Sequence, residues 1–230
     1  MDRDLLAAPA LDVAPLLLGA LLSVDSDEGP VTLRITETEA YHGLGTTGPY
    51  DPGAHSKDRR TERTASMFGP PAHAYVYLSY GLHHALNLVC SPEGVASAVL
   101  VRAGRVIDGL ELARWRRTRN RPGSGQQALP VRDEFLARGP GNLGRTLGIT
   151  RQEHDGLDLF SKPFGLQLPA SRAPRIAHGP RVGVSGPAGG SDFPWRFWIP
   201  GESSVSAFRP GRNAPRWRYD PLRDAFREPR

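Results

Sequence analysis

The stretch VTLRITETEAY at residues 31–41 alternates apolar and polar side chains through its first half. Val31, Leu33 and Ile35 would share one face of a β-strand, because successive side chains of a strand point to opposite faces. Such a strand buries its apolar face within a sheet. Other segments with a strand-like composition would supply the neighbouring strands, namely residues 73–80, 82–90, 95–104, 180–185 and 195–200.

Three other segments favour helices. Residues 12–23 carry a stripe of leucines and begin at Asp12, and residues 108–119 begin at Asp108. Aspartate is a preferred residue at the N-cap of a helix, so each would start the helix that follows it. Residues 142–149 predict a third, shorter helix.

Runs of strands with helices between them predict a single α+β domain, built on a curved, mostly antiparallel sheet with flanking helices. We expect this domain to cover residues 1–208. Residues 209–230, rich in arginine and proline, would form an irregular tail. Residues 121–130 read as a flexible loop. The long loop at residues 42–72 favours a functional role, because a loop of this length is unusual in a compact domain.

The charge of the chain comes almost entirely from arginine. Lysine and arginine number 29 against 24 acidic residues, a net charge of +5, and Lys57 and Lys162 are the only lysines. Arginine is always charged and binds phosphate well, so the balance favours a polyanionic partner such as nucleic acid. The alternative is an arginine-rich genome that gives basic proteins without any such role.

The sequence also suggests a cellular compartment. Cys90 is the only cysteine, which excludes an intrachain disulfide and favours a reducing compartment. The apolar run at residues 16–22 is too short to span a bilayer, and the start of the chain lacks the pattern of a signal peptide. We therefore expect a soluble intracellular protein that does not bind membranes.

Three tyrosines stand close together in the segment AYVYLSYG. Tyr75 and Tyr77 would share one face of a strand, where aromatic side chains are commonly part of the core. Tyr80 falls out of this period and precedes Gly81, so we expect it at an exposed turn. An exposed tyrosine there could contact a nucleic-acid base.

Two carboxylates follow the apolar part of the first strand. Glu37 and Glu39 would share one strand face beside Tyr41, and a carboxylate in this position could act as a general base. The alternative is a solvated strand edge.

The loop that follows carries His55 and four basic residues that could contact DNA phosphates, namely Lys57, Arg59, Arg60 and Arg63. The alternative is an ordinary charged loop. His73, His83 and His84 match no zinc spacing, and adjacent residues of a strand point to opposite faces, so we expect no metal site. The sequence also lacks the signatures of a serine-hydrolase elbow and of a phosphate-binding P-loop.

The order and spacing of several motifs resemble the alkyladenine DNA glycosylase family, also called 3-methyladenine or alkylpurine DNA glycosylases of the mammalian type. The resemblance rests on ITETEAYHG, AHSKDRRT, SMFGPPAHAYVYLSYG, LHHALNLVC and VLVRA, with RGPGNLGRTLGI and PRVGVS…WRFWIP as later segments. It covers roughly residues 10–200. It implies a fold similar to that of the C-terminal domain of methionyl-tRNA formyltransferase.

The resemblance implies a role for each matching residue. Glu39 resembles the general base that activates water, and Arg102 the arginine that helps to hold this water. Tyr41, His55 and Tyr77 resemble the aromatic side chains that sandwich a flipped base. Asn87 resembles the residue that crowds the 2-amino group of guanine, and Tyr80 the residue that fills the gap left by the flipped nucleotide. Lys57 stands where the family motif has arginine, and the residues after Tyr80 are bulkier in mammalian members.

The implied function is that of a monofunctional DNA glycosylase in base excision repair. It would remove 3-methyladenine, 7-methylguanine, hypoxanthine or ethenoadenine from double-stranded DNA, as a monomer without a cofactor, in the nucleoid-containing cytoplasm if the source is bacterial. A lyase-type glycosylase would need an amine nucleophile, and Lys57 is the only lysine near the motifs. A noncatalytic nucleic-acid-binding module, or a tRNA-binding domain of the formyltransferase type, would not need Glu39.

Overall fold

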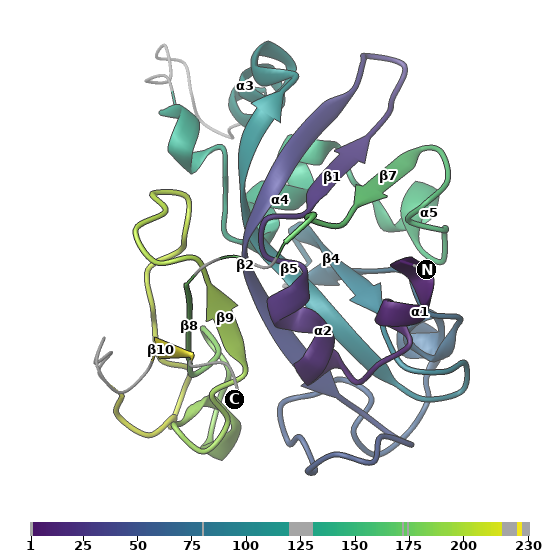
Figure 1. The fold of residues 1–230 in the computed structure, drawn as a ribbon, viewed down its shortest axis with the longest axis vertical. Helices are drawn as coiled ribbons and strands as arrows, with labels where there is room; N and C mark the ends of the chain where they lie inside the picture. The colour runs from purple at the N-terminus through teal and green to yellow at the C-terminus, as the bar shows by residue number, and fades with distance from the viewer. Residues whose placement is uncertain are drawn as a thin grey trace.

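The computed structural model describes residues 2–79, 81–119, 131–171, 173, 175–217 and 225–226. Within these residues the strands form one sheet, and all of its pairings are antiparallel (Figure 1). The order along the sheet is β10-β8-β9-β2-β5-β4-β3, with β1 beside β2, β7 beside β1 and β6 beside β5. The strands are β1 Leu21–Val24, β2 Val31–His42, β3 Ala74–Ser79, β4 His83–Val89, β5 Ser97–Asp108, β6 Ala137–Arg138, β7 Phe164–Gln167, β8 Ile176–Gly179, β9 Arg196–Trp198 and β10 Ala225–Phe226.

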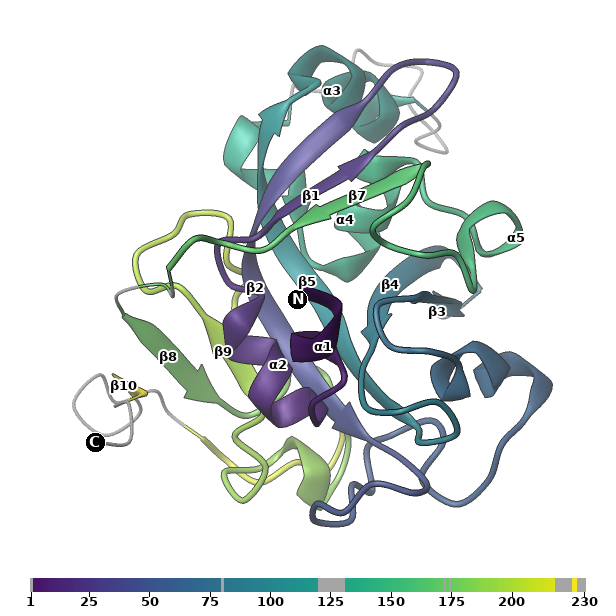
Figure 2. The same cartoon turned by 45° about the vertical axis from the view of Figure 1, so that its right-hand side comes forward.

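Short helices cover the sheet. They are α1 Asp2–Leu6, α2 Ala10–Leu16, α3 Leu110–Thr118, α4 Pro140–Leu147 and α5 Arg151–His154, with 3-10 turns at η1 Glu62–Phe68, η2 Asp133–Phe135 and η3 Pro187–Gly189. Helix α2 lies in front of β2 and β5 in both ribbon views (Figures 1 and 2). Val13 of α2 and Leu143 of α4 belong to the same buried core. This arrangement confirms the predicted α+β class and the mostly antiparallel sheet. None of the helices in the described ranges is long and apolar enough to cross a membrane.

Strand β2 changes its phase halfway along. Ile35 pairs with Gly104, Glu37 with Ala103 and Thr38 with Val101, which leaves Thr36 and Arg102 out of the Cα pairing. Before this irregularity the odd-numbered residues face the core. After it the even-numbered Ala40 packs in the core. The odd-numbered Glu39 and Tyr41 line a cavity instead.

The predicted helix at residues 12–23 is wrong in its second half. Helix α2 ends at Leu16, and residues 21–24 form β1, which pairs with both β2 and β7. Pro15 lies inside the helix, and Gly19 takes a φ of +91°, which a residue with a side chain rarely adopts. Asp12 lies in the first turn and does not cap the helix. Pro9 stands at the N-cap, where no side chain caps the helix by a hydrogen bond.

Two further sequence predictions need correction. Asp108 is the last residue of β5, and the N-cap of α3 is Gly109, whose φ is +73°. A Cβ atom at Gly109 would lie 2.3 Å from the carbonyl oxygen of Pro30, so the position accepts only glycine without rearrangement. Residues 180–185 form a turn at Val182 and Gly183 and no strand.

The remaining segments agree with the predictions in part. The loop at residues 42–72 is irregular apart from η1, and α4 begins two residues before the predicted start. Residues 121–130 lie outside the described residues, as does half of the predicted tail. The described part of that tail packs against the turn after β8, where the N–H groups of Gly183 and Gly186 donate to the carbonyl oxygens of Arg209 and Arg212. The two residues of β10 pair with β8.

Candidate active site

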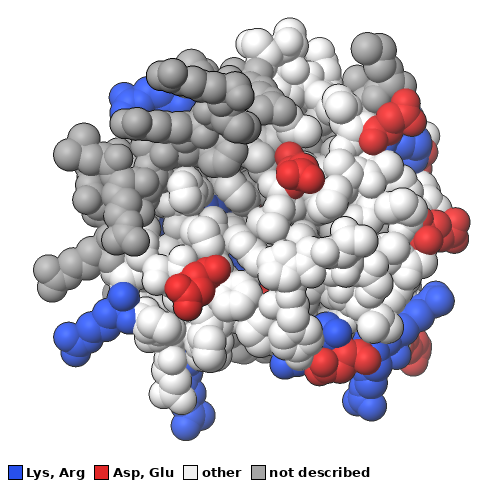
Figure 3. All heavy atoms as spheres, turned by 60° about the horizontal axis from the view of Figure 1, so that its bottom comes forward, with Lys and Arg blue, Asp and Glu red and all other residues white. Residues whose placement is uncertain are grey.

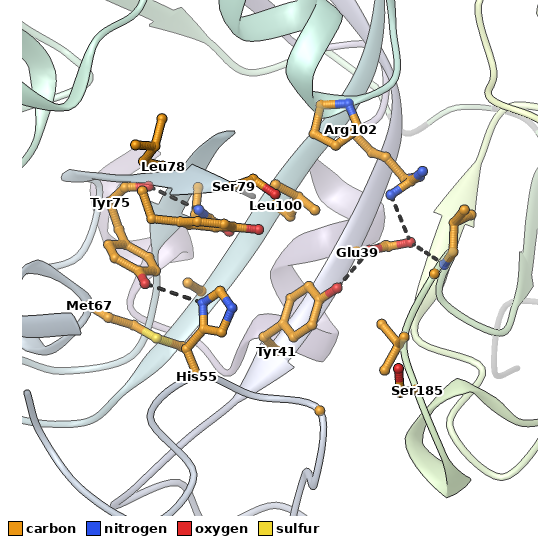
Figure 4. A pocket seen from close by; sticks show the side chains of 18 of the residues that line it. Glu39, Tyr41, His55, Met67, Tyr75, Leu78, Ser79, Leu100, Arg102 and Ser185 are labelled. Atoms are coloured by element: carbon orange, nitrogen blue, oxygen red, sulfur yellow. Dashed lines mark hydrogen bonds and ion pairs between the residues drawn. The ribbon is translucent and has the colours of Figure 1, made fainter. Parts of the chain in front are cut away.

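A cavity of about 1010 Å³ opens beside the middle of β2 and β5. Glu39 of β2 and Arg102 of β5 form one side of it, and residues from the 42–72 loop, β3, β4 and the 182–185 turn complete the wall (Figure 4). The cavity therefore brings together most of the residues selected from the sequence, namely Glu39, Arg102, Tyr41, His55, Tyr77, Asn87 and Arg63.

Glu39 is fully buried and its carboxylate is held by three groups. Oε2 accepts a hydrogen bond of 2.8 Å from the Tyr41 hydroxyl, and Oε1 accepts one of 2.7 Å from the N–H of Val182. Arg102 Nη1 lies 3.4 Å from Oε1. The alternative of a solvated strand edge is therefore wrong, because the side chain has no exposed surface. Hydrogen bonds and a guanidinium together stabilise a negative charge at this position.

Tyr41 can only donate to Glu39 while its hydroxyl keeps the proton. Burial of the phenol, and next the charge of Glu39, hold the pKa of Tyr41 well above its ordinary value. The hydroxyl therefore stays protonated at neutral pH, and the orientation of the Glu39 carboxylate is fixed.

Arg102 is held by a second carboxylate, that of Glu37. Arg102 Nε lies 3.0 Å from Glu37 Oε1 and donates to Ser206 Oγ at 3.1 Å. Burial lowers the pKa of Arg102, but the charges of Glu39 and Glu37 outweigh it and raise the pKa above its ordinary value. The guanidinium is therefore permanently charged.

Glu37 is itself fully buried and serves as the centre of this network. Besides Arg102, it accepts from Arg196 Nε at 2.6 Å, from the Ser206 N–H at 2.8 Å and from the Ser206 hydroxyl at 2.9 Å. Sequence reasoning placed Glu37 on the same face as Glu39 but gave no signal for Ser206 or Val182, which lie more than 140 residues away in the chain.

An aromatic wall faces the Glu39 carboxylate from the other side of the cavity. The rings of His55 and Tyr77 meet edge to face, with centroids 4.7 Å apart and planes at 89°. Tyr75 is buried beneath them, with its hydroxyl 3.4 Å from His55 Nδ1. Figure 4 shows Tyr41 and His55 next to each other in the cavity, with Tyr75 on the other side of His55 from Tyr41. The His55 ring is exposed to the open cavity, but its partial desolvation, and next the charge of Arg63, lower the pKa of His55, which therefore stays neutral near pH 7.

Asn87 lies on β4 in the floor of the cavity. Its side chain is buried, and Nδ2 donates a hydrogen bond of 2.9 Å to the carbonyl oxygen of Tyr75. This bond fixes the orientation of the side-chain amide. The strand backbone, and not solvent, therefore determines where the amide oxygen and the second N–H of Asn87 point.

The four basic residues of the loop lie in different surroundings. Arg63 lines the cavity, with its guanidinium carbon 5.5 Å from the Tyr77 ring centroid. Lys57 donates to the carbonyl oxygen of Pro52 at 3.2 Å, and Arg60 lies over the Phe68 ring. Arg59 is exposed. On the face that turns forward in Figure 3, some lysine and arginine side chains project singly and others stand together beside acidic side chains, with much uncharged surface in view.

The hairpin between β3 and β4 stands at the edge of the cavity. Ser79 and Gly81 both line it, and Tyr80 between them lies outside the described residues. Sequence reasoning missed Leu78 and Leu82, which expose 42% and 75% of their surface on this hairpin. This hairpin therefore presents two apolar side chains to solvent beside the cavity.

The described residues bring no three histidine, cysteine, aspartate or glutamate side chains into a group that could hold a metal ion. His83 is exposed and His84 half-buried, as expected for adjacent strand residues that point to opposite faces.

Comparison with known proteins extends this description. The sequence model of the methylpurine-DNA glycosylase family matches residues 4–203. A protein of Leifsonia xyli is 50% identical over 207 residues, which cover 90% of this chain and 92% of that protein. One of Streptomyces avermitilis is 46% identical over 91% of this chain and 92% of its own length, and one of Mycobacterium leprae is 40% identical over 94% and 92%. All three are named "Putative 3-methyladenine DNA glycosylase".

The family model covers nearly all of the chain that carries the cavity and its network. The protein therefore belongs to the methylpurine-DNA glycosylase family of DNA-repair enzymes, which hydrolyse N-glycosyl bonds.

Proposed function

We propose that the protein is a monofunctional glycosylase, which takes a damaged purine out of duplex DNA into the cavity and releases it by attack of a water molecule. The candidate substrates are 3-methyladenine, 7-methylguanine, hypoxanthine and ethenoadenine. The observation that carries the proposal is the buried Glu39 carboxylate, held between Tyr41, Val182 and Arg102 at the wall of a cavity large enough for a nucleotide.

The chemistry of N-glycosidic hydrolysis fits this carboxylate. The transition state carries positive charge on the sugar, as in other glycoside cleavages. A fixed carboxylate stabilises that charge, and it accepts a proton from the attacking water. Arg102 lies beside Glu39, and we assign it the role of holding the water.

The base would lie between Tyr41 on one side and the pair of His55 and Tyr77 on the other. The contact between His55 and Tyr77 is too close to admit a base between those two rings. Base–aromatic stacking contributes about 1–3 kcal/mol per base, which offsets the cost of a few kcal/mol for unstacking the nucleotide. Asn87 in the floor would exclude the 2-amino group of guanine.

We assign Tyr80 to the gap left in the duplex, because its neighbours Ser79 and Gly81 line the cavity. Arg63 is our first candidate for a phosphate contact, followed by Lys57, Arg59 and Arg60. We further propose that the protein acts as a monomer in the bacterial cytoplasm, in contact with the nucleoid, and that its fold is similar to the formyltransferase C-terminal domain.

Water, and not an amine, is the proposed nucleophile. Lys57 is bonded to Pro52 within its own loop and is absent from the cavity wall. Trapping with borohydride should therefore yield no covalent protein–DNA species. A trapped species that disappears when Lys57 is changed to glutamine would instead show a lyase mechanism.

The direct test is incubation with duplexes that carry one lesion each, with abasic sites scored afterwards. The Glu39→Gln variant is the matched control, because glutamine keeps the shape but cannot accept the proton. We expect its single-turnover rate to fall by about 10²–10⁴ while duplex binding stays nearly unchanged. No abasic sites from any lesion with the wild-type protein would refute the proposal, and a Glu39→Gln rate within about threefold of wild type would refute the role of Glu39.

A further inference from the structure

A buried ion pair lies directly behind the cavity wall. Arg181 and Asp51 are both fully buried. Arg181 Nη1 and Nη2 each donate to one carboxylate oxygen of Asp51 at 2.6 Å. Arg181 also donates to the carbonyl oxygens of Ala40 and Ala188, at 3.1 Å and 3.3 Å. A forked pair of this kind fixes the guanidinium in one place and one plane.

The fixed guanidinium stacks on an aromatic ring of the proposed base pocket. Its central carbon lies 4.5 Å from the centroid of Tyr41 and 5.0 Å from that of Trp195. Tyr41 lines the cavity, whereas Arg181 has no exposed surface. The Tyr41 ring therefore separates a permanent positive charge from the space in which a base would stack.

The backbone around Arg181 fits closely against its guanidinium. A Cβ atom at Gly53 would lie 2.8 Å from Arg181 Nη2, so the loop comes as close to the guanidinium as glycine allows. The next residue in the chain is Val182, whose N–H holds Glu39. Arg181 thus fixes the aromatic wall and one of the two hydrogen bonds on the catalytic carboxylate.

We propose that Arg181 is a positioning and specificity-determining residue. Its charge lies behind one face of the Tyr41 ring and disfavours the stacking of a positively charged base, relative to a neutral base, on the other face. The inference rests on the proposed function, in which the base stacks on Tyr41. Nucleotides of 3-methyladenine and 7-methylguanine carry a positive charge on the base, whereas those of hypoxanthine and ethenoadenine are neutral.

The physical reason is competition for one aromatic ring. A cation over an aromatic face is attracted by the electron density of that face. The Arg181 guanidinium behind the ring already polarises the same electron density, which leaves less of it to attract a cationic base. It also repels that base directly, because the site is buried and poorly screened. Asp51 offsets only part of this effect, because it binds the Nη edge of the guanidinium while the guanidinium itself stacks on Tyr41.

The test compares two lesions across three variants. Asp51→Asn with Arg181→Gln removes both charges and keeps hydrogen-bonding groups. Asp51→Leu with Arg181→Met removes them with apolar side chains, which often replace buried ion pairs without loss of stability. Arg181→Lys keeps the positive charge. Single-turnover excision of 7-methylguanine and of hypoxanthine is measured from the same duplex sequence, and thermal melts of the free proteins report folding.

We expect both double variants to raise the ratio of 7-methylguanine excision to hypoxanthine excision at least threefold, and Arg181→Lys to keep it within twofold of wild type. A loss of positioning alone would change the ratio in Arg181→Lys as well, because lysine cannot form the forked pair with Asp51 but keeps the positive charge. An unchanged ratio in either folded double variant, or an equal change in Arg181→Lys, would therefore overturn the inference. Failure of the wild-type protein to excise either lesion would refute the proposed function instead, and the inference with it.

Discussion

Glu37 offers the clearest quantitative test of the network behind the site. The Glu37→Gln substitution keeps the shape of the side chain but removes its charge. Four donors converge on this carboxylate, three on Oε1 and one on Oε2. Glutamine keeps a single acceptor oxygen, so its amide nitrogen must face either the two guanidinium groups and the Ser206 hydroxyl or the backbone N–H of Ser206.

The size of the effect follows from the burial of the partners. Glu37 has no exposed surface, and the side chains of Arg196 and Arg102 are 3% and 10% exposed. Breaking a buried pair by removing one charge costs about 3–5 kcal/mol. For a chain of this size each kcal/mol lowers the melting temperature by about 2–4 °C, so we expect a fall of about 6–20 °C. Excision should slow for all lesions alike, because Arg102 loses one of its two carboxylate partners.

The assay is thermal unfolding followed by circular dichroism, with Glu111→Gln as the control. Glu111 also pairs with an arginine, Arg114, but its side chain is 85% exposed, so its loss should cost no more than about 0.5 kcal/mol. A Glu37→Gln variant that melts within 2 °C of wild type, a threshold of roughly 1 kcal/mol, would refute the reasoning.

Three further substitutions test other parts of the molecule. Asn87→Ser should raise excision of undamaged guanine relative to hypoxanthine, and an unchanged ratio in a competition assay would remove Asn87 from the selectivity role. Tyr80→Ser should weaken flipping of an ethenoadenine duplex by about 1–3 kcal/mol in stopped-flow fluorescence and leave the melting temperature unchanged; a lower melting temperature with normal flipping would contradict intercalation. Burial lowers the pKa of His42 below its ordinary value of 6.5, and neither ring nitrogen has a hydrogen-bond partner in the described part of the protein. The neutral imidazole therefore contributes stability that is full above about pH 6.5 and is lost as the pH falls from there through the folded-state pKa. His42→Phe should flatten this acid dependence in urea titrations between pH 7 and pH 5, and an identical slope would show that other groups cause it.

The sequence predicts the parts of the site that belong to regular strands. The alternation at residues 31–35 and the composition of residues 73–80 and 82–90 predict strands, so Glu39, Tyr77 and Asn87 could each be placed on a strand. Motif resemblance supplied the roles of Tyr77 and Asn87 and added Arg102, and the structure brings all four to one cavity.

Other features depend on contacts that no local pattern encodes. The leucines of residues 16–22 fit a helix and a strand equally well, and the end of α2 is set by Pro15 and Gly19. Residues 180–185 have the composition of a strand, but the N–H of Val182 bonds to a side chain, Glu39, 143 positions away. A backbone donor carries no residue identity, so the sequence gives no signal for it. Arg181 looked like an ordinary strand residue for the same reason.

The irregularity in β2 means that the number of residues, and not only their type, decides where Glu37, Glu39 and Tyr41 point. A strictly alternating strand would direct Glu37, Glu39 and Tyr41 to the same side as Ile35, into the apolar interior beneath α2. Thr36 and Arg102 are each left out of the pairing, and this exchanges the faces of the residues that follow. The Glu39 carboxylate therefore lies in the cavity. Insertion of one residue between Thr36 and Glu37 would return these side chains to the interior, because a one-residue shift exchanges the two faces of a strand. Such an insertion should therefore be far more damaging than Thr36→Ser, which keeps the hydroxyl that meets Ser204.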